Sequence, residues 1–145
     1  MKTVIQRVLK AEVTAGRKSS KIEEGILSLV AVKKGDSPAD AAYLAEKTAH
    51  LRIFEDDSGK MNFSVRDTEG SVMAVPQVTL YGDCLKGRRP GFDDCASYSE
   101  GLNLFNIFVR ELKSRGVHTE TGFYGKDMSV ELINDGPVTF IVESK

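Results

Sequence analysis

The sequence has little of what metal, redox or membrane chemistry requires. It contains two cysteines and two histidines, with no CxxC and no Cys/His pair at metal-ligand spacing, so zinc binding and thiol–disulfide chemistry have little support. No apolar run approaches the length of a membrane span, and the first residues, MKTVIQRVLKAEV, lack the apolar core of a signal peptide. We therefore expect a cytoplasmic protein that binds no membrane, no metal and no other cofactor.

The familiar catalytic motifs are also missing. The chain has no GxSxG elbow, no P-loop and no GxGxxG. Thr79 is a candidate nucleophile, but the sequence places no histidine where it would activate the hydroxyl. A threonine in a β-rich run is usually structural, and the paired carboxylates at 56–57 and 93–94 fall in turn-like, solvated segments. The residues alone therefore do not identify a catalytic side chain.

Charge of one sign is absent as well. Twenty Lys and Arg residues stand against 21 Asp and Glu residues, a formal net charge of −1. Such a chain does not bind nucleic acid through overall positive charge, so any contact must come from a local patch. The candidate patch is KGRRPGF, residues 86–92. A solvated surface loop is the alternative for that segment.

What is present is the composition of one globular domain, residues 1–145, with 41% hydrophobic and 28% charged residues. β-Branched and alternating residues predict strands at 2–8, 11–15 and about 21–32. Another β-rich run covers 71–81, where Pro76 implies a strand edge, a bulge or the end of a strand.

Two segments switch to helical periodicity. Ser37 and Pro38 are suited to the cap and first position of a helix of about four turns. Ser99 can cap a second helix that ends at Gly116, and its predicted apolar face comprises Leu104, Phe105, Phe108 and Leu112. The sum is an α+β domain of mostly antiparallel strands with two helices packed on one side.

The stretch NDGPVTF, residues 134–140, places a Gly-Pro pair between two predicted strands. Proline lacks a backbone N–H and is normally excluded from the middle of a sheet. A hairpin turn explains the stretch locally, because Asn, Asp, Gly and Pro all favour turns.

Five segments, in order, resemble the D-aminoacyl-tRNA deacylases, first described as D-tyrosyl-tRNA deacylases. They are VIQRV (4–8), 44–62, PQVTLYGDCLKGRRPGF (76–92), TGFYGKDMSV (121–130) and NDGPVT (134–139). Two of them correspond to the family motifs SQxTL and NxGPxT. The second motif is intact, whereas Pro76 replaces the serine of the first.

The resemblance implies a deacylase-type fold and a homodimer with active sites at the subunit interface. The implied reaction is hydrolysis of the ester that joins a D-amino acid to the 3′ end of tRNA. A cis Gly136–Pro137 bond from the neighbouring subunit would exclude L-amino acids, whose side chains would meet its carbonyl groups. Glycine has no side chain, so glycyl-tRNA mischarged on tRNA-Ala should pass the same filter.

The resemblance also assigns roles to individual residues. Backbone N–H groups of Val78 and Thr79 would hold the substrate carbonyl, and Gln77 would help to form the pocket floor. Arg7 would orient the Gly-Pro carbonyl groups. The implied pocket wall is Tyr124, Gly125 and Met128, and the residues implied to meet tRNA phosphates are Lys86, Arg88 and Arg89.

Pro76 leaves two other functions open. Proline supplies neither the hydroxyl nor the N–H of the usual serine. A related editing family, which removes misplaced L-alanine from tRNA, carries proline at this position, so a relaxed L-alanyl-tRNA deacylase is the second hypothesis. The third is a non-catalytic module that binds the tRNA end.

Overall fold

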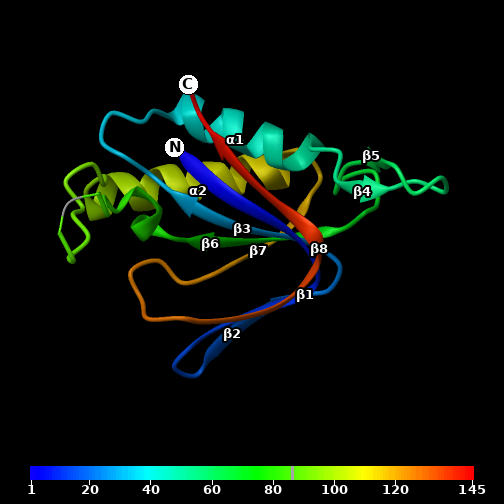
Figure 1. The fold of residues 1–145 in the computed structure, drawn as a ribbon, viewed down its shortest axis with the longest axis horizontal. Helices are drawn as coiled ribbons and strands as arrows, with labels where there is room; N and C mark the ends of the chain where they lie inside the picture. The colour runs from blue at the N-terminus through cyan, green and yellow to red at the C-terminus, as the bar shows by residue number, and fades with distance from the viewer. Residues whose placement is uncertain (86) are drawn as a thin grey trace.

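The computed structural model describes residues 1–85 and 87–145. A six-stranded sheet runs in the order β2, β1, β3, β6, β7, with β8 also paired to β1, and a separate pair of short strands projects from one end (Figure 1). The strands are β1 (Lys2–Ala15), β2 (Lys18–Ile22), β3 (Gly25–Ala31), β4 (Phe54–Glu55), β5 (Met61–Phe63), β6 (Ser71–Pro76), β7 (His118–Thr121) and β8 (Ser129–Glu143). The helices are α1 (Pro38–His50), α2 (Tyr98–Ser114) and the 3-10 helix η1 (Val78–Tyr81).

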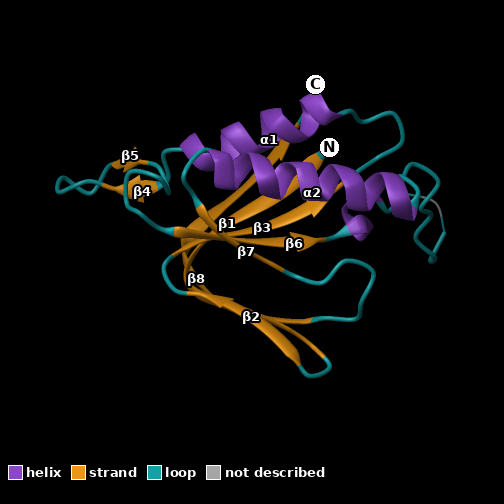
Figure 2. Ribbon diagram, turned by 180° about the vertical axis from the view of Figure 1, so that it is seen from behind, coloured by secondary structure: helices purple, strands orange, loops and turns teal. Residues whose placement is uncertain are grey.

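The two helices cover one face of the sheet, as predicted (Figure 2). The C-terminal half of β1 curls away beneath the other face, together with β2 and the N-terminal half of β8, which pair with it. One apolar cluster fills the space between sheet and helices and includes Ile5, Leu44 and Phe108. A second cluster, which includes Leu27 and Met73, lies in the curl. The central strands are therefore buried on both faces. No helix among the described residues is long and apolar enough to cross a membrane.

The N-terminal segment is one strand, so the prediction of two strands at 2–8 and 11–15 is wrong. Strand β1 pairs with β3 through residues 2–8 and with β2 through residues 11–15. It changes partner along one edge while β8 follows the other edge. Leu9 and Lys10 are both exposed, which interrupts the alternation of the strand, yet a register shift carries the strand across them without a break.

The C-terminal segment is also one strand, and the hairpin explanation of NDGPVTF is wrong. Both halves of β8 run antiparallel to β1, with Asn134 opposite Val8 and Thr139 opposite Gln6. A hairpin would reverse the chain, whereas here residues 135–138 form a bulge between two paired stretches. The proline is tolerated because no ladder hydrogen bond is required of it in this bulge.

The β-rich run at 71–81 ends as a strand at Pro76, and Val78–Tyr81 forms η1 instead of the predicted strand. The N–H of Gln77 donates to the Val30 carbonyl on the β3 side at 2.8 Å. Successive N–H groups of a strand point to opposite edges, so the nitrogen of Pro76 faces the β7 side. The last β6–β7 pair there is Ala74 with Thr121. The proline thus stands where the ladder no longer needs a donor. Both β6 pairings are parallel, so the sheet is mixed.

Both predicted helices form, with one change of cap. Helix α1 follows Ser37 and begins at Pro38, as predicted. Helix α2 is capped by Ser97 and not by Ser99: the Ser97 hydroxyl accepts from the Glu100 N–H at 3.4 Å, and the Glu100 carboxylate accepts from the Ser97 N–H at 3.2 Å. Ser97 prevails because a glutamate three residues later completes a capping box, which Ser99 lacks.

Candidate active site

A cavity of about 560 Å³ opens at the end of strands β3 and β6, beside the start of α2. It is lined by segments that lie far apart in the sequence: the end of β3, the β6–η1 junction, the residues before α2 and the loop that leads to β8. The predicted site residues that line this cavity are Pro76, Gln77, Val78, Thr79, Tyr124, Gly125 and Met128. We call it the first cavity.

The β6–η1 junction supplies backbone donors at this cavity. Val78 and Thr79 are the first residues of a 3-10 helix, so their N–H groups have no acceptor within that helix. The Gln77 side-chain amide donates to the Thr79 hydroxyl. Among the described residues, this amide is the side-chain partner found for the Thr79 hydroxyl, and an amide is not a base that could activate a nucleophile. The chemistry available here is stabilisation of a carbonyl oxygen by N–H groups.

Cys95 contacts the same junction, with its sulfur 3.6 Å from the Val78 carbonyl oxygen. Burial raises the pKa of the Cys95 thiol above its usual value, and the nearby carboxylate of Asp94 raises it further. Because the thiolate is the nucleophilic form, this thiol is a weak nucleophile at neutral pH.

The wall opposite the junction is aromatic. The ring of Tyr124 lies edge-on to Tyr98, with centroids 5.2 Å apart, and is tilted against Phe105 at 5.9 Å. Burial raises the pKa of the Tyr124 hydroxyl, with further contributions from Tyr98 and Cys95, so this hydroxyl stays neutral at physiological pH. Two glycines permit the close approach: a Cβ at Gly101 would lie 2.1 Å from the Tyr124 hydroxyl oxygen, and one at Gly125 would lie 2.5 Å from the Tyr98 ring.

We predict that Gly101→Ala moves Tyr124 and lowers kcat/KM for the substrate by about tenfold or more, since small displacements in a site are costly. Alanine is otherwise favoured in a helix by about 1 kcal/mol, so the melting temperature should not fall with activity. Asn103→Ala, an exposed change in the same helix, is the matched control. Wild-type activity in Gly101→Ala would show that the position of Tyr124 is unimportant.

The remaining predicted site residues lie elsewhere. Arg7 is buried, and its guanidinium donates to the Ile53 carbonyl at 2.6 Å and to the Asp135 carbonyl at 3.1 Å. It also pairs with the Asp135 carboxylate at 2.9 Å. Arg7 thus braces the bulge that contains Gly136 and Pro137, whose peptide bond is cis.

The bulge and the first cavity are separated within the chain. None of Arg7, Gly136 and Pro137 is among the residues that line the cavity. Figure 1 shows the orange-red bend of β8 at the other end of the sheet from the green segment that carries η1. The structure therefore divides the predicted catalytic and substrate-binding residues into two groups that do not meet in one chain.

The predicted basic patch follows η1. Arg88 and Arg89 are exposed, in a loop closed by a bridge between Asp83 and Gly91. Lys86 lies outside the described residues. Arg88 and Arg89 thus follow the β6–η1 junction in the sequence. The contacts of the described residues assign them no role at the first cavity.

Sequence reasoning missed nine of the residues that line the first cavity, among them Ala96, Tyr98 and Phe105. The spacing of Ser97 and Glu100 carried the signal for the first two. A capping box there starts the helix at Tyr98. It also brings Ala96, the residue before the cap, to the sheet, where the Ala96 N–H donates to the Val32 carbonyl at 3.1 Å. Phe105 was assigned to the core, which it also joins.

Known proteins match the chain over its length. Residues 4–143 match the family model described as D-Tyr-tRNA(Tyr) deacylase. A D-aminoacyl-tRNA deacylase of Geobacter sulfurreducens is 56% identical over 146 residues, covering 100% of this chain and 96% of that protein. A protein of the same name from Bacillus cereus is 53% identical, with 100% of both chains covered.

Solved structures of known proteins share the fold of this chain. The c-Myc DNA Unwinding Element Binding Protein is 36% identical with a TM-score of 0.92, over 100% of this chain and 99% of that one. A probable eukaryotic D-amino acid tRNA deacylase shares the fold at 16% identity and a TM-score of 0.87, over 99% and 98% of the two chains. The chain therefore belongs to the D-Tyr-tRNA(Tyr) deacylase family, and the first cavity and the Gly-Pro bulge braced by Arg7 are features of a member of that family.

Proposed function

We propose that this protein hydrolyses the ester bond of D-aminoacyl-tRNA and releases the free D-amino acid and tRNA, a proofreading step of translation in the cytoplasm. The observation that carries the proposal is the pair of backbone donors at Val78 and Thr79, in a cavity where the partner found for the Thr79 hydroxyl among the described residues is the Gln77 amide. An ester is already an activated acyl group, so a positioned nucleophile and a stabilised oxyanion suffice.

In this mechanism the N–H groups of Val78 and Thr79 bind the carbonyl oxygen and stabilise its negative charge as water adds to the carbon. The 2′-hydroxyl of the terminal ribose assists proton transfer, because the described side chains at the β6–η1 junction include no base. The ribose oxygen then leaves with a proton. The test is release of free tyrosine from D-Tyr-tRNA; an inactive protein that still binds the tRNA end would instead be a binding module.

The active unit in this proposal is a homodimer. Gly136 and Pro137 lie far from the first cavity of their own chain, so a second subunit has to bring them there. Strands β1 and β8 also present exposed apolar side chains, with Ile141 70% and Leu9 46% exposed, as expected of a surface that is covered on assembly. Light scattering should give twice the chain mass of 15.9 kDa.

Mixed dimers test the shared site directly. Gly136→Ala spoils the bulge and Gly101→Ala spoils the cavity, so each homodimer should be impaired. In a mixed dimer, an intact cavity of one chain meets an intact bulge of the other, and activity should return. No recovery on mixing, with exchange of subunits demonstrated, would contradict the shared site.

Chirality is set in this proposal by the partner's Gly136–Pro137 carbonyl groups, which clash with the side chain of an L-amino acid. Arg7 orients these carbonyls through its contact with Asp135. Initial rates should be high on D-Tyr-tRNA and on glycyl-tRNA carried by tRNA-Ala, and low on L-Tyr-tRNA. Equal rates on D- and L-Tyr-tRNA would remove this role.

We predict that Thr79→Ala remains active. The N–H of residue 79 survives the change, and only a hydroxyl already held by Gln77 is removed. Activity should stay above about a tenth of wild type, whereas loss of a true nucleophile costs several orders of magnitude. An acyl group trapped on Thr79 would contradict this mechanism.

We further propose that Lys86, Arg88 and Arg89 contact tRNA phosphates. Replacing all three with glutamine should weaken tRNA binding and reduce the slope of log K against log salt by about one for each phosphate that is no longer neutralised. The ratio of D to L rates should not change. Lys113→Gln, at an exposed site on α2, is the control, and an unchanged affinity at low salt would identify a solvated loop.

Pro76 favours one second candidate. It lines the first cavity without a hydroxyl or an N–H, so the site is less polar there than with the serine of the family motif. A relaxed site would also accept mischarged L-alanyl-tRNA. Rapid cleavage of L-Ala-tRNA by the wild type, and its loss in Pro76→Ser, would establish this activity.

A further inference from the structure

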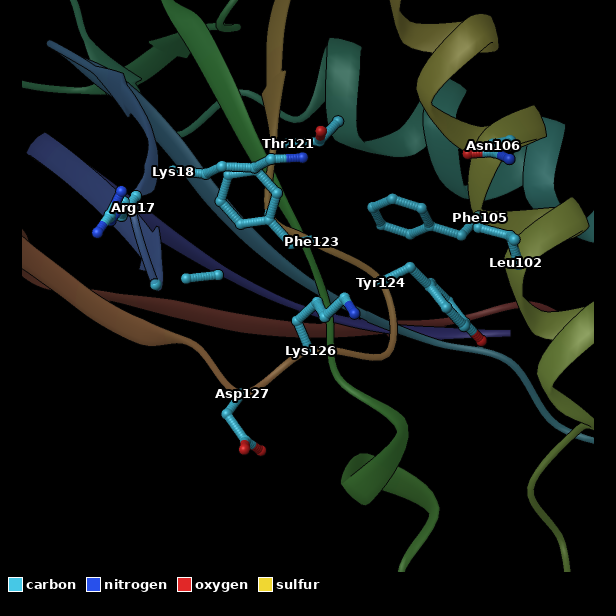
Figure 3. A pocket seen from close by; sticks show the side chains of 13 residues that line it. Arg17, Lys18, Leu102, Phe105, Asn106, Thr121, Phe123, Tyr124, Lys126 and Asp127 are labelled. Carbon is cyan, nitrogen blue, oxygen red and sulfur yellow. The ribbon is translucent and has the colours of Figure 1, made fainter.

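A second cavity, of about 790 Å³, lies on the other side of Tyr124. It is formed by helix α2, the turn between β1 and β2, and the loop that follows β7 (Figure 3). Phe105, Tyr124, Lys126 and Asp127 line both cavities. The two cavities are therefore neighbours that share the wall formed by Tyr124.

The interior of the second cavity is aromatic and apolar. Leu102 and Phe105 come from α2, and Phe123 and Tyr124 come from the loop after β7. Figure 3 shows the rings of Phe105, Phe123 and Tyr124 around the hollow. Phe105 is buried, whereas Phe123 and Tyr124 are half-buried. Partly exposed rings such as those of Phe123 and Tyr124 are surfaces on which unstacked nucleobases bind, whatever their sequence.

The rim of the second cavity is basic. Arg17, Lys18 and Lys126 are exposed there, and none of the ion pairs found among the described residues involves them. In Figure 3 the Lys126 amine lies toward the hollow, whereas the Asp127 carboxylate is directed away from the rings. Cations next to an aromatic interior suit a phosphate joined to a base.

We propose that the second cavity binds the penultimate nucleotide of the tRNA 3′ end, with its base against Phe123 and its phosphate near Lys18 and Lys126. The inference rests on the proposed function, which places the terminal aminoacylated adenosine in the first cavity. The neighbouring nucleotide then has to leave across the shared wall. Since tRNA ends in CCA, the occupant is a cytidine.

The test compares the D-tyrosyl esters of adenosine, of the dinucleotide CpA and of a CpA analogue that lacks the cytosine base. For the wild type, kcat/KM should be about tenfold or more higher for the CpA ester than for the adenosine ester. The difference should come chiefly from a lower KM, as expected when one base stacks. The analogue without cytosine should recover only the phosphate part of this gain.

Two variants at residues that do not line the first cavity separate the contributions of the base and of the phosphate to the higher kcat/KM of the CpA ester. Phe123→Leu keeps an apolar side chain but removes the ring, and should abolish the cytosine part while treating the adenosine ester as wild type does. Lys18→Ala, a surface change that leaves the core untouched, should abolish the phosphate part. Lys21→Ala, an exposed lysine of the same strand that does not line this cavity, is the control.

Each outcome bears on the inference. Equal rates on adenosine and CpA esters, or a full gain in both variants, would overturn it. If no D-tyrosyl ester is cleaved, the proposed function fails, but titration with unacylated CpA and adenosine still decides the second cavity. CpA should then bind about tenfold more tightly than adenosine to the wild type, and Phe123→Leu should lose the part of this gain that the cytosine supplies.

Discussion

Gly136→Ala should lower the rate of D-Tyr-tRNA hydrolysis by about 100-fold or more, the scale expected when catalytic geometry is displaced. A Cβ on Gly136 would lie 2.6 Å from the Asn134 side-chain oxygen and 2.7 Å from the Val138 nitrogen. Asn134 cannot simply swing aside, because its amide donates to the Arg7 carbonyl at 2.9 Å and to the Val138 carbonyl at 3.3 Å. The bulge must deform, and its carbonyl groups move with it.

The effect should be specific to activity. Gly136 is exposed in the chain, so no core packing depends on it, and the melting temperature should fall far less than the activity does. Glu131→Ala, an exposed change on the same strand, serves as control and should keep full activity. Rates on D-Tyr-tRNA and the dimer mass are measured together. A dimeric, fully active Gly136→Ala would rule out the bulge as part of the site.

Gly25→Ala should destabilise the fold by about 3 kcal/mol or more, at the upper end of what overpacking costs. Strand β3 enters the sheet at Gly25, which pairs with Val8 of β1 on one side and with Ser71 of β6 on the other. A Cβ there would lie 1.9 Å from the Ser71 carbonyl oxygen and 2.7 Å from its nitrogen. Both are backbone atoms, so relief requires the strands to separate.

Urea unfolding measures this effect as a lower midpoint with a similar slope. For a domain of ordinary stability the decrease is a large fraction of the total, and poor expression is expected. Gly91→Ala is the matched control, because a Cβ at Gly91 meets nothing within 4 Å. An unchanged midpoint for Gly25→Ala would mean that the β3–β6 pairing can open at little cost.

Much of the fold could be predicted because it follows local rules. Proline at the first position of α1 and the apolar stripe of α2 are helical signals that tertiary packing reinforces. The errors arose where pairing is not local. Whether β1 is one strand or two depends on β8, which is more than a hundred residues away, and the same pairing turns an apparent hairpin at 134–140 into a bulge.

The candidate site was less accessible to residue-by-residue reasoning. Its donors are the backbone N–H groups of Val78 and Thr79, and the side-chain types at these positions do not indicate that role. Only the resemblance of the PQVTL segment to a family motif pointed there. Even the resemblance did not indicate Ala96 or the second cavity. These depend on how α2 lies against the loop after β7, and no single segment of sequence carries that information.

The position of β1 between its partners has a consequence for synthesis on the ribosome. One edge of β1 is matched early by β2 and β3, but the other edge waits for β8, residues 129–143. Until that segment emerges, a long strand presents unpaired N–H and C=O groups to every neighbouring nascent chain, which invites aggregation. Such high contact order also slows folding, so the yield of native protein should depend on how quickly the last strand reaches the first.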